Sequence, residues 1–77
     1  MKIIYSPRFE RAYKKLSDDV KDDAELAEGI FRKNPLDARL RTHKLSGRLS
    51  DYWSFSVDFE YRIIFYYGKS KEDIFLT

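Results

Sequence analysis

The run Tyr61-Arg62-Ile63-Ile64-Phe65-Tyr66-Tyr67 is apolar on both faces of an extended strand, apart from its single arginine. A strand of this kind belongs in the middle of a sheet, with both of its faces covered. The residues before it alternate, which is the period of a half-buried strand. Trp53, Phe55, Val57 and Phe59 fall on the expected core face, and Tyr52, Ser54, Ser56 and Asp58 fall on the expected wet face.

The run therefore predicts an antiparallel sheet in the second half of the chain. A short turn near residues 58–60 separates its first two strands, and Gly68 to Glu72 is expected to form the next turn. Asp73 to Thr77 is expected to form one more strand.

Two amphipathic helices are predicted before the sheet. After a short strand from Lys2 to Tyr5, a serine and a proline form a helix entry, and apolar residues at i, i+3, i+4 and i+7 predict a helix from Pro7 to Leu16. Ser17 caps a second helix that ends near Lys33, where we expect Asn34 to take the left-handed conformation. The fold class is therefore α+β, in the order β-α-α-β-β-β, with a helical hairpin packed on a small antiparallel sheet.

Composition indicates a single globular domain that spans residues 1–77. Hydrophobic residues make up 43% of the chain and charged residues 36%, and there is no cysteine. Packing alone must stabilise such a chain, which suits a reducing compartment. No apolar run approaches the roughly 20 residues that cross a bilayer. We therefore predict a cytoplasmic protein without a membrane segment.

The charges are unevenly placed, although the net charge is only +2. Between Asp18 and Glu28 there are six acids and one lysine, whereas the segment from residue 39 to residue 48 has no acid. A solvated loop is one interpretation of that basic segment, and contact with the phosphates of a polyanion is the other. The candidate phosphate contacts are Arg39, Arg41, Lys44 and Arg48.

Three further residues are candidates for chemistry. His43 is the only histidine in the chain, and histidine is the side chain best suited to proton transfer near neutral pH. Arg62 interrupts an apolar strand, so it needs either a carboxylate partner such as Glu60 or a bound phosphate. Tyr61 is the candidate for stacking on a nucleotide base. No motif for a metal or a nucleotide cofactor occurs.

This chain resembles the RelE/ParE superfamily of type II toxins, and most closely its mRNA-interferase branch of RelE-, YoeB- and YafQ-like members. The likeness covers nearly the whole chain and rests on the order of its elements and of three motifs. These are His43-Lys44-Leu45-Ser46-Gly47, Trp53-Ser54-Phe55-Ser56-Val57 and Glu60-Tyr61-Arg62-Ile63-Ile64-Phe65-Tyr66.

The resemblance implies a cytoplasmic toxin that binds the A site of the 30S ribosomal subunit and cuts mRNA there without a metal or cofactor. A ribose 2′-hydroxyl would attack the adjacent phosphate and leave a 2′,3′-cyclic phosphate. The implied partners are the ribosome-bound mRNA and a cognate antitoxin that wraps around the toxin and blocks its cleft. Translation inhibition and plasmid stabilisation are the implied biological effects.

Site residues follow from the same resemblance. Arg62 matches the arginine of the Glu-x-Arg motif that stabilises the transition state, and Glu60 matches the acid of that motif, as a base or an RNA contact. His43 matches the histidine that heads the His-x-Leu-x-Gly motif, and Lys44 is the neighbouring phosphate contact.

Two alternatives remain open. A ParE-type member would inhibit gyrase without a nuclease site, and an inactive relative would only bind an antitoxin. Interferases of this kind usually carry a histidine or tyrosine, as general acid or base, in a short segment after the last strand, and this sequence has no residue after Thr77. We therefore expect the 77-residue form to cleave RNA slowly, because losing one proton-transfer group costs about 10²- to 10⁴-fold in rate.

Overall fold

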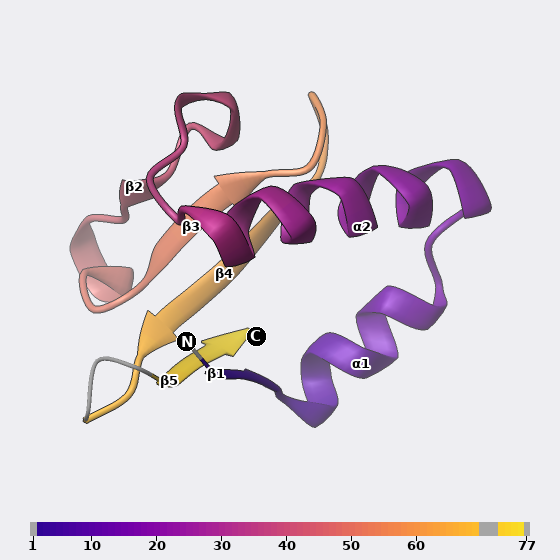
Figure 1. Ribbon diagram of the computed structural model, residues 1–77. Helices are drawn as coiled ribbons and strands as arrows, with labels where there is room; N and C mark the ends of the chain where they lie inside the picture. Colours follow the sequence, from indigo (N-terminus) through magenta and orange to yellow (C-terminus); the bar gives the residue numbers. More distant parts are fainter. Residues whose placement is uncertain (1, 70–72, 77) are drawn as a thin grey trace.

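The computed structural model describes residues 2–69 and the strand at residues 73–76 (Figure 1). The predicted β-α-α-β-β-β order is confirmed. The connection after the second helix adds one two-residue strand and two short 3₁₀ helices that were not predicted. The elements are β1 (Lys2–Tyr5), α1 (Pro7–Lys14), α2 (Asp18–Lys33), η1 (Ala38–Leu40), β2 (His43–Lys44), η2 (Gly47–Leu49), β3 (Trp53–Ser56), β4 (Arg62–Tyr67) and β5 (Asp73–Leu76).

Both α-helices begin at the predicted serine caps. The side chain of Ser6 accepts a hydrogen bond from the amide of Phe9 at 3.0 Å, and that of Ser17 accepts one from the amide of Val20 at 3.4 Å. Each bond satisfies one amide that the first turn of a helix leaves without a backbone partner. The caps therefore fix the two helix starts where the sequence predicted them.

The two helix ends differ from the prediction in detail. α1 ends at Lys14, and the amide of Leu16 bonds three residues back at 3.1 Å, so the last predicted turn is tighter than an α-helical turn. α2 ends at Lys33 as predicted. Asn34, however, is extended, with φ −158°, and its side chain accepts the amide of Leu36 at 3.0 Å. The expected left-handed Asn34 was therefore wrong, because this side-chain bond turns the chain instead.

The sheet has the strand order β1-β5-β4-β3-β2, so β4 is the central strand, as its two apolar faces predicted. The pairs β2–β3, β3–β4 and β4–β5 are antiparallel, but β1 runs parallel to β5. The sheet is therefore mixed, with an antiparallel part of four strands. Of the predicted turn at residues 68–72, residues 70–72 lie outside the described residues, and so does Thr77.

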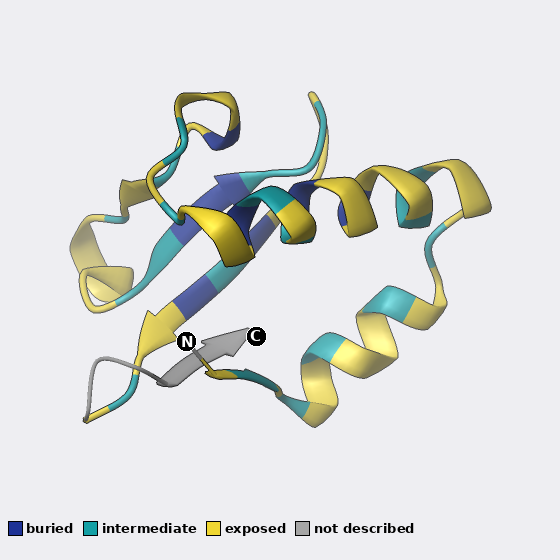
Figure 2. Cartoon of the chain, in the orientation of Figure 1, coloured by how far each residue is buried: buried dark blue, intermediate teal, exposed yellow. Residues whose placement is uncertain are grey.

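Both helices pack on one face of this sheet, where the hydrophobic core lies (Figure 2). Phe31 of α2 has no exposed surface, and its ring centroid lies 4.4 Å from that of Phe55 and 4.9 Å from that of Phe65. Leu40 of η1 closes the core beside the end of α2, and Phe9 of α1 packs against its rim. The other face of the sheet is left without a helix among the described elements.

Two residues in the segment that was predicted to alternate, Ser54 and Phe59, differ in solvent exposure from the prediction. Ser54 was placed on the wet face but is only 1% exposed, because Ile64 and His43, its partners across the strands, are larger and shield it. Phe59 was placed on the core face but is fully exposed. β3 ends at Ser56, so the period of two does not extend to Phe59 in the following turn.

Ser54→Ala is expected to leave the free energy of unfolding unchanged or to raise it by about 1 kcal/mol. The buried Ser54 hydroxyl has no hydrogen-bond partner in the described chain, and an unsatisfied buried hydroxyl is costly. Urea unfolding of the two proteins measures the difference. Ser56→Ala is the control, because the Ser56 hydroxyl accepts a bond from Arg62. A loss of more than about 1 kcal/mol on Ser54→Ala would show that its hydroxyl is bonded.

Candidate functional site

The candidate residues gather on the sheet face that the helices leave uncovered, which we call the open face. Residues paired across strands point to the same side of a sheet, and residues along a strand alternate. Ser56 pairs with Arg62, Ser54 with Ile64, and His43 with Ser54. The ring of Tyr52 meets that of Tyr66. The open face therefore consists of His43, Tyr52, Ser54, Ser56, Arg62, Ile64 and Tyr66.

Arg62 begins β4 and is exposed, with its guanidinium donating to the Ser56 hydroxyl at 3.1 Å. Glu60 does not pair with it, because Glu60 lies in the preceding turn and its amide donates to Asp58 at 2.8 Å. Among the described side chains, the ion pairs are Arg32–Glu28 and Arg39–Asp37. The alternative of an internal Glu60–Arg62 pair is therefore wrong, and the charge of Arg62 is available to a ligand.

His43 is held in place by the backbone two residues before it. Its Nδ1 lies 3.0 Å from the carbonyl oxygen of Arg41. A carbonyl can only accept a hydrogen bond, so Nδ1 carries the proton, and Nε2 of the neutral ring is left as a base. Arg41 has a left-handed backbone with φ 51°, which ends the 3₁₀ helix η1, and its amide donates to the carbonyl of Ala38 at 3.3 Å.

On the open face, His43 and Arg62 are close enough for their side chains to contact the same phosphate group. The two residues lie on strands separated by β3 and are offset by two positions in register. With strands about 4.8 Å apart and a rise of about 3.3 Å per residue, their Cα atoms are about 12 Å apart. Both side chains are exposed. A phosphodiester bound between them could be contacted from both sides.

The four cations of the basic segment do not act as one cluster. Arg39 forks onto Asp37, with Nε and Nη2 at 3.0 Å and 2.9 Å from the two carboxylate oxygens. Lys44 pairs with Trp53 in register, so it points to the side opposite His43. Arg41 and Arg48 are exposed and have no ion pair in the described residues.

The hydrogen bonds from Arg39 should shift the titration of the Asp37 carboxyl. The bond from the Arg39 side chain, helped by the Arg39 amide, lowers the pKa of Asp37 from 3.8 to about 2. The stability that this pair contributes is therefore present above pH 3.8 and is lost as the pH falls toward 2. Carboxylate NMR should show the Asp37 carboxyl titrating near 2, and Arg39→Ala should raise its pKa part of the way toward 3.8, because the amide of residue 39 still donates to the carboxylate. An unchanged midpoint in Arg39→Ala would contradict the fork.

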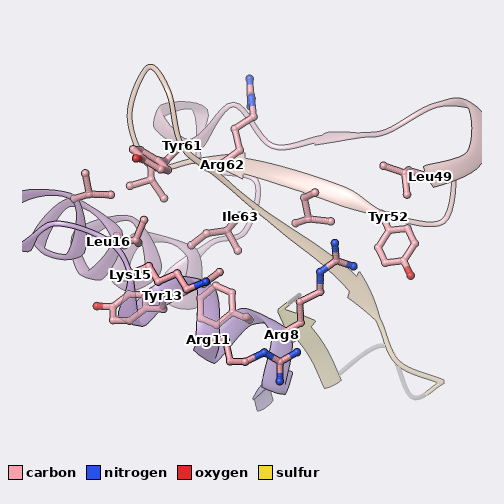
Figure 3. A pocket seen from close by; sticks show the side chains of 16 residues that line it. Arg8, Arg11, Tyr13, Lys15, Leu16, Leu49, Tyr52, Tyr61, Arg62 and Ile63 are labelled. Atoms are coloured by element: carbon pink, nitrogen blue, oxygen red, sulfur yellow. The ribbon is translucent and has the colours of Figure 1, made fainter.

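A groove of about 830 Å³ runs between α1 and the sheet (Figure 3). Its floor is largely apolar, and Arg8 and Arg11 of α1 line it together with Lys15 and Arg62. In the described chain, β5 pairs with β4 only from Phe65 onward, so the groove borders the first half of β4. Arg8 and Arg11 of α1 and Lys15 at its C-cap were not predicted as site residues, although their spacing of three and four residues places them on one helix face.

Tyr61 also lines this groove, as do Tyr52, Arg62 and Ile64 of the open face. In Figure 3 its side chain leaves the chain in a different direction from that of Arg62. The fold therefore places His43 and Arg62 on one face of the sheet, with Lys44 on the opposite face and with Glu60 and Tyr61 before the start of β4. Residues 2–69 and 73–76 contain no group of three or more His, Cys, Asp or Glu residues that could bind a metal ion. None of the described helices is long and apolar enough to cross a membrane.

Comparison with solved structures identifies the fold. A YoeB/ParE toxin from Agrobacterium tumefaciens matches with a TM-score of 0.78 and 15% identity, over 100% of this chain and 93% of that chain. The heterotetrameric YoeB–YefM toxin–antitoxin complex from Staphylococcus aureus matches with a TM-score of 0.71 and 22% identity, over 100% and 91%. A copper-bound mutant toxin from Helicobacter pylori matches with a TM-score of 0.67 and 16% identity, over 100% and 89%.

These matches confirm the predicted RelE/ParE resemblance at the level of the fold. No family model matches the sequence, and no curated protein matches it. The likeness therefore comes from the arrangement of the helices and strands over the whole chain.

Proposed function

From the fold that it shares with YoeB/ParE toxins, we propose that this chain is the toxin of a toxin–antitoxin pair and cuts mRNA on the ribosome. The observation that carries the proposal is the common placement of His43 and Arg62 on the open face, neither of them in an ion pair with a described carboxylate. The proposed place of action is the A site of the 30S subunit in the cytoplasm. The reaction uses no metal or cofactor.

The proposed reaction needs a base and a cation on either side of one phosphate. Nε2 of His43 takes the proton of the ribose 2′-hydroxyl as the 2′-oxygen forms its bond to phosphorus. The bond from phosphorus to the 5′-oxygen breaks, and that oxygen takes a proton from water. The products are a 2′,3′-cyclic phosphate and a 5′-hydroxyl. Arg62 stabilises the negative charge that grows on the phosphate oxygens in the transition state.

The remaining candidates have proposed binding roles that follow their positions. Arg41 and Arg48 contact phosphates of flanking nucleotides, because both are exposed and unpaired in the described chain. Lys44 and Arg39 lie further from the reacting phosphate and add to the attraction of the RNA. Glu60 and Tyr61 meet the RNA only at the edge of the open face, where the turn before β4 ends.

An antitoxin is the proposed protein partner. The matching Staphylococcus aureus structure is a complex of YoeB with YefM. The groove beside α1 combines an apolar floor with the cations of Arg8, Arg11 and Lys15, so it suits a segment that is both apolar and acidic. A partner bound there also reaches Arg62, which lines the same groove, and would therefore block the open face.

Incubation of the chain with ribosomes that hold a defined mRNA tests the proposal. We expect cleavage within the A-site codon, and none of the same mRNA without ribosomes. A gyrase supercoiling assay with the same preparation tests the ParE-type alternative. Blocked supercoiling together with intact mRNA would reject the ribonuclease proposal. Antitoxin binding without either activity would indicate an inactive relative.

A further inference from the structure

We infer that Tyr52 and Tyr66 form a stacking platform for a base of the RNA on the open face. Their ring centroids are 5.6 Å apart, and the rings meet edge to face at 81°. In this arrangement each ring fixes the orientation of the other, so the platform is rigid before RNA arrives. The inference rests on the proposed function, because it assigns the RNA a second point of contact.

The position of the pair relative to Arg62 fits a nucleotide next to the cleaved one. Arg62, Ile64 and Tyr66 follow one another on the same side of β4, so the tyrosine lies four positions after the arginine. At a rise of about 3.3 Å per residue, their Cα atoms are about 13 Å apart. His43 lies level with Ile64, through Ser54, and therefore midway along the strand direction between Arg62 and Tyr66.

Tyr66 and its neighbour Tyr67 face opposite sides of the sheet. Tyr66 is 36% exposed on a face without a helix, whereas Tyr67, its neighbour in β4, points to the helix side. The ring of Tyr67 packs edge to face on Trp53 at 5.9 Å and on Phe65 at 5.5 Å, so its role is structural. Two adjacent tyrosines of equal exposure thus have different environments.

This inference replaces Tyr61 by the Tyr52–Tyr66 pair as the stacking site. Tyr61 is 41% exposed, but it lies before Arg62 and outside the paired register of β3 and β4, whereas Tyr52, which lines the same groove, meets the ring of Tyr66. Stacking on an aromatic ring tolerates any base, because every base has a π face. We therefore expect the pair to position the RNA without selecting a codon.

The test uses ribosomes that hold an mRNA with 2-aminopurine in the A-site codon and a 2′-O-methyl group at the cleaved nucleotide. Binding of the chain should quench 2-aminopurine, because the base stacks on the tyrosine pair. Tyr66→Ala and Tyr52→Ala should abolish most of the quenching, and Tyr66→Phe should keep it, since the ring is what the base contacts. In single-turnover cleavage of unmodified mRNA, the two alanine variants should be roughly 10- to 100-fold slower.

Phe59→Ala is the matched control, because it removes a fully exposed aromatic ring that lies in the turn before β4 and has no assigned role in RNA binding. Cosedimentation with ribosomes and circular dichroism establish that each variant binds and folds. If Tyr66→Ala does not fold, the platform is tested by comparing the 2-aminopurine quenching of Tyr52→Ala with that of the unmodified chain. Normal quenching and cleavage by a folded Tyr52→Ala would overturn the platform while the proposed function survives. Absence of ribosome binding and cleavage by the unmodified chain would overturn both.

Discussion

Arg62→Ala is expected to lower the rate of mRNA cleavage by about 10²- to 10³-fold without changing the urea midpoint of unfolding. A group that stabilises charge only in the transition state contributes on this scale when it is removed. The Arg62 side chain is exposed, and its one hydrogen bond within the described chain goes to the Ser56 hydroxyl. The core does not need this side chain, so activity and stability should separate.

Two companion variants sharpen this prediction. Arg62→Lys keeps the charge but loses the planar fork that binds two phosphate oxygens at once, so its rate should lie between those of the parent and Arg62→Ala. Ser56→Ala removes the hydrogen-bond partner of Arg62 and leaves its charge in place, so it should cost far less than Arg62→Ala. A folded Arg62→Ala protein that cleaves at the parent rate would contradict the role of Arg62.

Phe31→Ala is expected to lower the free energy of unfolding by about 3–5 kcal/mol. Phe31 has no exposed surface and is the residue of α2 whose ring contacts both Phe55 of β3 and Phe65 of β4. Its removal leaves a cavity between the helix and the sheet. Domains of this size have only about 5–15 kcal/mol of total stability, so one such change removes a large part of it.

The control for Phe31→Ala lies on the same helix. Leu26 is 69% exposed, so Leu26→Ala should change the free energy of unfolding by less than about 0.5 kcal/mol. Urea unfolding measures both variants. Equal losses in the two variants would contradict the role given to the contact between Phe31 and the sheet. Cleavage by Phe31→Ala should fall only in proportion to its unfolded fraction, in contrast to Arg62→Ala.

The local parts of the fold could be predicted from the sequence. The helix starts at Ser6 and Ser17 could be predicted because each cap bond joins residues only three positions apart, so the local sequence contains both partners. The central position of β4 follows from its two apolar faces. The parallel pairing of β1 with β5 could not be predicted, because it joins the two ends of the described chain and no local pattern records it.

The candidate site was predicted as a set of residues but not as a surface. His43 and Arg62 were both identified, and only the register of β2 with β3 and of β3 with β4 shows that they share a face. β2 has two residues, too few to show a period in the sequence. Asp37 was overlooked as the partner of Arg39, because it lies just outside the acid-free segment.

The burial of Ser54 could not be predicted from the alternation of apolar and polar residues. A period of two assigns Ser54 to the polar side of its strand, but it does not tell how large the neighbouring side chains are. Ile64 and His43 flank this small residue in the sheet, and together they exclude water from it.

The central claim is that the open face cuts RNA by attack of a ribose 2′-hydroxyl. The most direct measurement is mass spectrometry of the 3′ ends of mRNA recovered from ribosomes after incubation with the chain. The account predicts fragments that end in a 2′,3′-cyclic phosphate within the A-site codon, and their absence with Arg62→Ala. Intact mRNA, or fragments that end in a 3′-hydroxyl, would contradict it.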